Sequence, residues 1–149
     1  MKSEYTIERL KEINQKNVEE INDLIPQLTS NVQVNLSKER IDELINSSFT
    51  SLIAAKNRSN EIIGILTLVT YPSLLKSRVA WIEDLVVNIK YRGQGIGESL
   101  IKKALEEAKK MSVQTIFLTS RPSRIAANSL YVKMGFIKKE TNCYKMELT

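Results

Sequence analysis

Histidine is absent from this 149-residue sequence, and cysteine occurs only once, as Cys143. Without histidine the chain lacks the usual general base, the partner of Ser-His and Cys-His nucleophiles and the commonest metal ligand. A single cysteine cannot form a disulfide within its own chain, and no histidine is present to activate its thiol. We therefore expect no metal, and we expect Asp, Glu, Tyr, Lys or water to move protons.

Long hydrophobic runs are also missing. No apolar stretch approaches the roughly 20 residues that span a bilayer. The first ten residues, MKSEYTIERL, lack the apolar centre of a signal peptide. We expect a cytoplasmic protein with no membrane partner, and one domain covering residues 1–149, because no linker, repeat or low-complexity segment divides the chain.

The net charge is +5. This surplus fits an anionic ligand, and it also fits a plain solvated basic surface or weak binding to nucleic acid. The basic residues are scattered, and no element interleaves basic with aromatic residues as nucleic-acid-binding surfaces do. We therefore expect no nucleic-acid partner.

Hydrophobic spacing predicts an α/β (α+β) chain. The expected strands cover residues 5–10, 51–56, 61–70, 78–87, 115–120, 136–140 and 144–148. Helices are expected to begin at Asn17, at Ser37, at Ser123 and after the glycines that follow residue 87. Gly135 suits a helix end that needs a left-handed residue. The result is a mostly antiparallel central sheet of six to seven strands, about four helices and one parallel β-α-β crossover.

Three of the five glycines lie within VVNIKYRGQGIGESLIKKAL, residues 86–105. Glycine weakens a helix by up to about 1 kcal/mol per site, so the start of this helix requires bare backbone. The first turn of a helix has unpaired N–H groups and a partial positive charge, and glycine lets a phosphate approach them. The pattern predicts a pyrophosphate-binding loop; a plain glycine-rich turn is the alternative.

Two familiar phosphate loops do not fit. A P-loop needs Gly-Lys-Ser/Thr, whereas Glu98 and Ser99 follow Gly97. The dinucleotide-binding fingerprint needs a third glycine at position 98 or 100, where Glu98 and Leu100 stand.

What remains, Arg92-x-x-Gly95-x-Gly97, resembles the pyrophosphate motif of the GNAT superfamily of acyl-CoA-dependent N-acetyltransferases. The segment AANSLYVKMGF, residues 126–136, is similar to that superfamily's later motif, Asn-x-x-Tyr followed by Gly-Phe. The order of the elements also matches. The resemblance implies transfer of an acetyl group from acetyl-CoA, as cosubstrate, to an amine acceptor. A non-catalytic acyl-CoA sensor is the alternative, and many relatives pair, which allows a homodimer.

The resemblance also implies the residues that contact the cosubstrate. The backbone of Leu85, Val86 and Val87, on a strand that bulges in the family, would pair with the pantetheine arm, although plain core packing also explains these side chains. The pyrophosphate would bind Arg92, Gly93, Gln94, Gly95, Ile96, Gly97 and Glu98. Glu98 departs from the family pattern, since a carboxylate near the phosphates is unfavourable unless it points away from them. As a residue of the first helical turn, Glu98 also complements the helix dipole.

Further contacts would come from the later motif. Asn128 would contact the cofactor arm, one helical turn before Tyr131. Arg121 and Arg124 either meet the ribose phosphate or an acidic substrate group, or are exposed charges at a helix start.

Acetyl transfer to an amine needs a base. An amine with a pKa of about 10.4 is protonated at pH 7, and removing its proton costs roughly 4–5 kcal/mol. The family often has Glu at the position of Glu83, so we expect Glu83 to be the base, with Asp84 in reserve and a buried structural acid as the alternative. Tyr131 would protonate the departing thiolate; a half-buried structural tyrosine is the alternative. The identity of the acceptor stays open.

Overall fold

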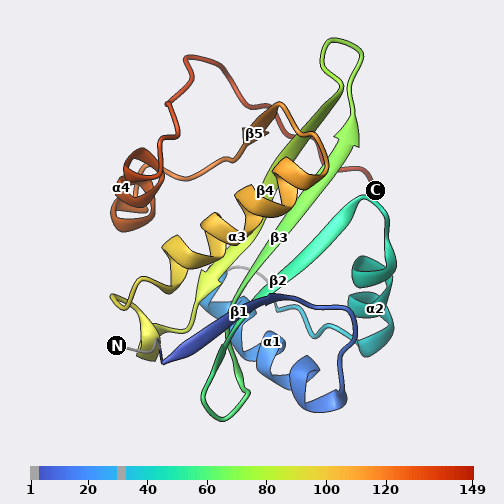
Figure 1. Ribbon diagram of the computed structural model, residues 1–149, viewed down its shortest axis with the longest axis vertical. Helices are drawn as coiled ribbons and strands as arrows, with labels where there is room; N and C mark the ends of the chain where they lie inside the picture. The colour runs from blue at the N-terminus through green and yellow to red at the C-terminus, as the bar shows by residue number, and fades with distance from the viewer. Residues whose placement is uncertain (1–3, 30–32) are drawn as a thin grey trace. The chain divides into compact units, whose positions relative to one another are not determined.

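The computed structural model describes residues 4–29 and 33–149 (Figure 1). The chain divides into two compact units, Met1–Leu118 and Thr119–Thr149, and each is described by itself. The interpretation of residues 1–149 as one domain stays a prediction.

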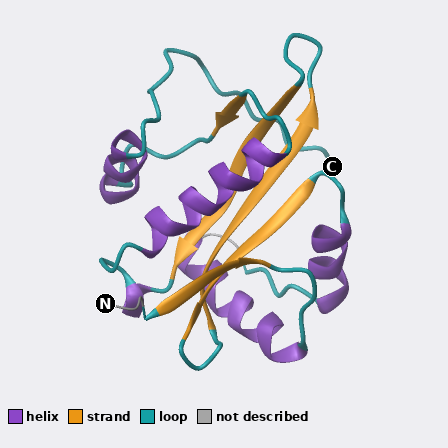
Figure 2. Cartoon of the chain, in the orientation of Figure 1, coloured by secondary structure: helices purple, strands orange, loops and turns teal. Residues whose placement is uncertain are grey.

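The first unit contains a five-stranded sheet in the order β1-β2-β3-β4-β5 (Figure 2). Its strands are β1 (Tyr5–Arg9), β2 (Thr50–Asn57), β3 (Ile62–Pro72), β4 (Arg78–Val87) and β5 (Thr115–Phe117). The pairs from β1 to β4 are antiparallel, and β4 and β5 are parallel. The predicted class, a mostly antiparallel mixed sheet with one parallel crossover, is therefore confirmed.

Helices cover both faces of this sheet. α1 (Gln15–Leu28) and α2 (Lys38–Asn46) share a core cluster with Ile65 of β3. The neighbouring Gly64 faces the opposite way, since a Cβ there would lie 3.3 Å from Leu100 of α3 (Ile96–Lys110). Side chains alternate across a strand, so odd-numbered residues from Ile65 to Tyr71 face α1 and α2, and even-numbered ones face α3.

The helix starts are set by capping side chains. Ser37 caps α2 as predicted, accepting the N–H of Arg40 at 3.2 Å. The prediction of Asn17 as the cap of α1 is wrong by three residues, because Asn14 and Asn17 form a reciprocal capping box in which Asn14 is the N-cap. Asn17 therefore supports the first turn from inside the helix.

The second unit contains α4 (Ile125–Lys133). Arg124, without a side-chain cap bond, is its N-cap, so the prediction of Ser123 is wrong; Gly135 has a φ of +93° and confirms the left-handed helix end. The predicted strands 136–140 and 144–148 are not formed, which gives five strands instead of six to seven. Residues 144–148 alternate as strands do, but a strand also needs a partner to pair its backbone, and neither segment has one among the described residues.

Candidate active site

A β-bulge interrupts β4 next to its two acidic residues. Ile65 of β3 lies opposite Val86, and Thr67 lies opposite Glu83, so β3 advances by two residues where β4 advances by three. Asp84, within the bulge, has a φ of +54°. The bulge that the family resemblance implies in this strand is therefore present. As a result, Glu83 and Val86 face the same side of the sheet although they are three residues apart.

The parallel strands β4 and β5 part early. They pair only at Val79–Thr115, Ala80–Ile116 and Trp81–Phe117. From residue 82 to residue 87, within the described chain, β4 has no strand partner on the side of β5 and pairs only with β3. The side chains of Leu85 and Val86 are buried in the core, while their main chain belongs to this unpaired edge. An unpaired edge can accept another extended chain.

The glycine loop, residues 92–98, begins just beyond this edge, after the 3-10 turn η1 (Ile89–Tyr91). Gly93 and Gly95 have φ values of +77° and +80°, which favour glycine because a Cβ is strained there. Gly95 is the N-cap of α3 and makes no side-chain cap bond. The side chain of Ile96 is buried and anchors the first turn. The loop thus presents the backbone of a helix start, as predicted, next to the open edge of β4.

The two charged residues of the glycine loop point to protein partners. Arg92 donates from Nε to the carbonyl oxygen of Val87 at 2.9 Å, which ties the loop to the end of β4. Glu98 forms an ion pair with Lys102, one turn along α3, at 2.8 Å. The hydrogen bond that Lys102 donates to Glu98, and then the negative charge of Glu98, raise the pKa of Lys102. The carboxylate that departs from the family motif is therefore neutralised by a partner within its own helix.

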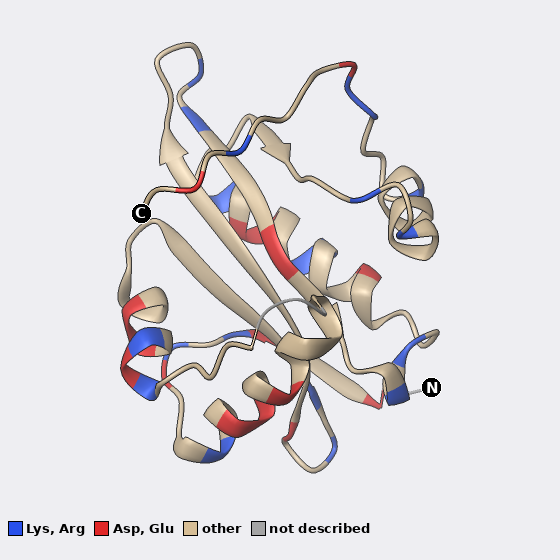
Figure 3. Cartoon of the chain, turned by 180° about the vertical axis from the view of Figure 1, so that it is seen from behind, with Lys and Arg blue, Asp and Glu red and all other residues tan. Residues whose placement is uncertain are grey.

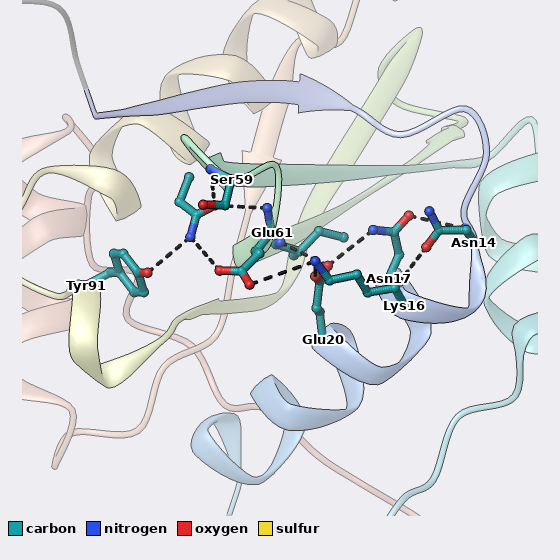
Figure 4. Close-up of polar contacts among 9 residues, drawn as sticks. Asn14, Lys16, Asn17, Glu20, Ser59, Glu61 and Tyr91 are labelled. Atoms are coloured by element: carbon teal, nitrogen blue, oxygen red, sulfur yellow. Dashed lines mark hydrogen bonds and ion pairs between the residues drawn. The ribbon is translucent and has the colours of Figure 1, made fainter.

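A polar network connects η1 to the β2–β3 turn and to α1 (Figure 4). Asn57, at the end of β2, donates to the hydroxyl of Tyr91 at 3.1 Å and to Glu61 at 2.8 Å. Glu61 lies 3.9 Å from the ammonium of Lys16, which is 3.7 Å from Glu20 of the same helix. The β2–β3 turn thereby links η1, which leads into the glycine loop, to α1. Nothing in the sequence pattern marks Asn57 or Tyr91 as partners, so this contact could not be predicted.

The candidate base, Glu83, is exposed together with Asp84, while Ile82 and Leu85 on either side of them are buried. Partial burial, and then repulsion from the Asp84 carboxylate, raise the pKa of Glu83 above its ordinary value of 4.5. Because Glu83 lies opposite Thr67, it faces the α1–α2 side of the sheet.

The residues of the later motif belong to the second unit. Asn128 donates to the backbone oxygen of Arg121 at 2.9 Å. Tyr131 is buried, and its ring packs edge-on against Phe136 at a centroid distance of 6.1 Å. Burial raises the pKa of Tyr131, and the charge of Arg124 opposes this rise only in part. These contacts all lie within the second unit. In the first unit, Glu83 lies on β4, and the glycine loop follows the end of that strand.

The first unit has two hollows, of which the second adjoins the glycine loop. One of about 540 Å³ lies between α1 and the start of α2, and one of about 240 Å³ adjoins Tyr91 and Gln94.

Acidic and basic residues are interspersed along the chain (Figure 3). The described residues contain no cluster of metal-ligating side chains and no helix long and apolar enough to cross a bilayer.

A bulged strand with an open edge, followed by a glycine loop at a helix start, is the arrangement of the acyl-CoA-dependent acyltransferase class that the sequence resembles. The acetyltransferase (GNAT) family model matches residues 17–136, and the chain belongs to this family.

Its relatives are matched over part of their length. An uncharacterized N-acetyltransferase of Methanocaldococcus jannaschii is 38% identical over 65 residues, which cover 44% of this chain and 29% of the relative. The [ribosomal protein bS18]-alanine N-acetyltransferase of Escherichia coli K12 is 36% identical over 53 residues, 36% of each chain. The match thus spans about a third of the length of either relative.

Solved structures show the same fold. An aminoglycoside acetyltransferase from an uncultured soil metagenomic sample, in complex with trehalose, superposes with a TM-score of 0.86 over 99% of both chains at 20% identity. A structure described as a transcriptional regulator from Bacillus halodurans superposes with a TM-score of 0.78 over 97% of this chain and 99% of that one, at 26% identity.

Proposed function

We propose that this chain is an acetyl-CoA-dependent N-acetyltransferase that acetylates a primary amine by direct attack in a ternary complex. The observation that carries the proposal is the unpaired edge of β4, residues 82–87, which ends at a glycine loop with bare helix-start backbone. An extended arm can add to that edge as a strand does, and a pyrophosphate can bind the amides at the helix start. Family membership supplies the identity of this ligand as acetyl-CoA.

Binding of the cosubstrate divides between two stretches of backbone. The main chain of Leu85, Val86 and Val87 binds the pantetheine arm, and their side chains keep the core closed. The amides of the glycine loop bind the pyrophosphate, and Arg92 adds a fixed positive charge. Asn128 contacts the cofactor arm, a role carried over from the family motif.

The reaction requires three proton transfers. The amine nitrogen bonds to the acetyl carbonyl carbon as the carbon–sulfur bond breaks, and backbone N–H groups of β4 stabilise the charge on the carbonyl oxygen. Glu83 receives the proton that the ammonium loses. Tyr131, whose raised pKa keeps the phenol protonated at neutral pH, donates its proton to the departing sulfur. The second proton that the nitrogen loses as the amide forms returns to the Tyr131 phenolate. The chain needs no covalent intermediate for this sequence of steps.

The matched pair Glu83→Gln and Asp84→Asn tests the assignment, since the two residues are adjacent and both exposed. Thiol release from acetyl-CoA is measured against a panel of small amines, amino acids and peptides, and acetyl-CoA binding is measured by calorimetry. Removing a general base lowers kcat by about 10²–10⁴-fold, so Glu83→Gln should lose turnover and keep its affinity for acetyl-CoA. Asp84→Asn should retain most turnover. Binding without thiol release for every amine would identify the sensor alternative instead.

The pH profile provides an independent check of the base. Glu83 must be ionised to accept a proton, and its pKa is raised above 4.5. The kcat/KM of the wild-type protein should therefore fall as the pH is lowered through that raised pKa, and the fall should be absent from the residual activity of Glu83→Gln. The same acid limb in both proteins would assign it to another group. Homodimerisation and a cytoplasmic location stay predictions.

A further inference from the structure

Three aromatic side chains form a surface at the outer end of the sheet, which we call the aromatic platform: Tyr71, Trp81 and Phe117. The rings of Trp81 and Phe117 are stacked, with their centroids 5.2 Å apart and an interplanar angle of 29°. The indole Nε1 of Trp81 donates to the hydroxyl of Tyr71 at 3.0 Å. The three rings come from three adjacent strands, β3, β4 and β5, so the sheet fixes their positions.

The platform faces the same side of the sheet as Glu83. Trp81 lies opposite Val69, and Glu83 lies opposite Thr67. Val69 and Thr67 are two residues apart on β3, so they share a face, and their partners share it too. The bulge begins only after Glu83 and leaves this relation intact. Trp81 and Glu83 are thus neighbours on one face, about 7 Å apart along the strand.

The platform is partly open to solvent. Tyr71 is 39% exposed, and Trp81 and Phe117 are half-buried. At the far side of the platform from Glu83, the ammonium of Lys76 lies over the Phe117 ring, 5.9 Å from its centroid. One end of the platform therefore carries the carboxylate of Glu83, and the other end carries the ammonium of Lys76.

We propose that the aromatic platform binds the acceptor, and that the acceptor is a monoamine whose amino group is joined to a flat apolar body by two or three carbons. The inference rests on the proposed function and names the substrate class for it. The ammonium lies at Glu83, where its proton is lost, and the flat body packs on Trp81. An aromatic pair of this kind contributes about 0.5–1.5 kcal/mol beyond its buried area, which is roughly 2- to 13-fold in affinity.

The charges argue against a polycationic acceptor. A second positive group on the ligand would approach Lys76 at the outer end of the platform. The chain as a whole carries a net charge of +5, which repels polycations at long range. A single ammonium is matched by Glu83, and a neutral body is matched by the rings. The selected class is therefore an arylalkylamine, and the disfavoured class is a polyamine.

Trp81 is the only tryptophan of the chain, so its fluorescence reports directly on the platform. Intrinsic fluorescence is titrated with 2-phenylethylamine and with n-butylamine in the presence of coenzyme A, which supplies no acetyl group. We expect a saturable change with 2-phenylethylamine at a lower concentration than with n-butylamine. The absence of any fluorescence change with 2-phenylethylamine would overturn the inference.

Kinetics with the same two amines separate platform binding from general damage. Trp81→Leu should lower kcat/KM for 2-phenylethylamine by about 3- to 10-fold, and Trp81→Phe should restore most of the loss. With n-butylamine, which has the same ammonium and no ring, kcat/KM should change by less than about 2-fold. Equal losses for both amines would overturn the inference.

The two proposals fail differently. If acetyl-CoA binds but no amine releases thiol, the proposed enzymatic function fails, while the fluorescence titration still tests the platform as a binding surface. If n-butylamine and spermidine release thiol as efficiently as 2-phenylethylamine, and Trp81→Leu does not alter this, the acceptor class is overturned and the acetyltransferase function stands.

Discussion

Gly95→Ala is the substitution that tests the glycine loop most directly. Gly95 has a φ of +80°, and left-handed backbone costs a residue with a Cβ about 1–2 kcal/mol. The added Cβ would meet only the hydroxyl of Tyr5, at an ordinary contact distance of 3.7 Å. Backbone strain, and not a steric clash, therefore sets the cost in folding stability. For a chain of this size each kcal/mol lowers Tm by about 2–4 °C, so we expect a decrease of about 2–8 °C.

The same substitution should weaken acetyl-CoA binding by more than the loss of stability explains. A methyl group at the N-cap lies where the pyrophosphate would approach the helix start. Loss of one backbone hydrogen bond to a charged group corresponds to about 1.5–3 kcal/mol, which is roughly a 10- to 150-fold increase in Kd. The affinity is measured by calorimetry with acetyl-CoA alone, so that the acceptor plays no part.

Ile41→Val serves as the stability-matched control. Ile41 is buried in the cluster formed with α1 and α2, and its shortening by one methyl group costs about 0.5–1.5 kcal/mol. This variant should melt lower and bind acetyl-CoA as the wild type does. If Gly95→Ala also bound with wild-type affinity, the glycine loop would not be the pyrophosphate site, and the reasoning from bare backbone would be refuted.

Three further substitutions test the surrounding structure. Gly64→Ala places a Cβ 3.2 Å from the oxygen of Val86 and should lower the free energy of unfolding by about 1–3 kcal/mol in denaturant titrations; an unchanged midpoint would contradict this close packing. Tyr91→Phe removes the hydroxyl that accepts from Asn57, and should raise the Kd for acetyl-CoA several-fold with a Tm change under about 3 °C; an unaltered Kd would show that this bond does not position the glycine loop. Burial alone would raise the pKa of Glu107, but hydrogen bonds from two lysines of α3 lower it below 4.5. The ionised carboxylate therefore stabilises the folded protein at pH values above the pKa that Glu107 has in the unfolded chain, and this stabilisation is lost as the pH falls. Glu107→Gln should therefore lower Tm at pH 7 by the equivalent of about 1–2 kcal/mol and much less near pH 3; equal decreases at both pH values would contradict the ion-pair origin.

Local signals in the sequence predicted the elements whose formation depends on local contacts. Ser37 precedes a single run of apolar residues, and no other capping residue competes with it closely. At α1 two asparagines compete, and the reciprocal bonds between Asn14 and Asn17 make the earlier one the cap. The apolar pattern begins only at Val18, so hydrophobic spacing alone places the helix start too late.

Pairing between distant segments was harder to predict than the elements themselves. The segment 144–148 alternates as strands do, and this period specifies a face without specifying a partner. The bond between Asn57 and Tyr91 joins residues 34 positions apart and has no local signal. The glycine loop was predictable because backbone conformation restricts residue type at that position itself, as the φ of Gly95 illustrates.

The bulge in β4 explains why the candidate site could be predicted only in part. Strict alternation allows one of Glu83 and Asp84 to face a given side, and it would place Glu83 and Val86 on opposite faces. The extra residue at Asp84 cancels that alternation, so Glu83, Trp81 and the buried Val86 lie on one face. The same interruption occurs where β4 has lost β5 as a partner. The position of Glu83 beside Trp81 follows from strand alternation, whereas the position of Glu83 and Val86 on one face depends on the bulge and does not follow from the sequence of β4 taken alone.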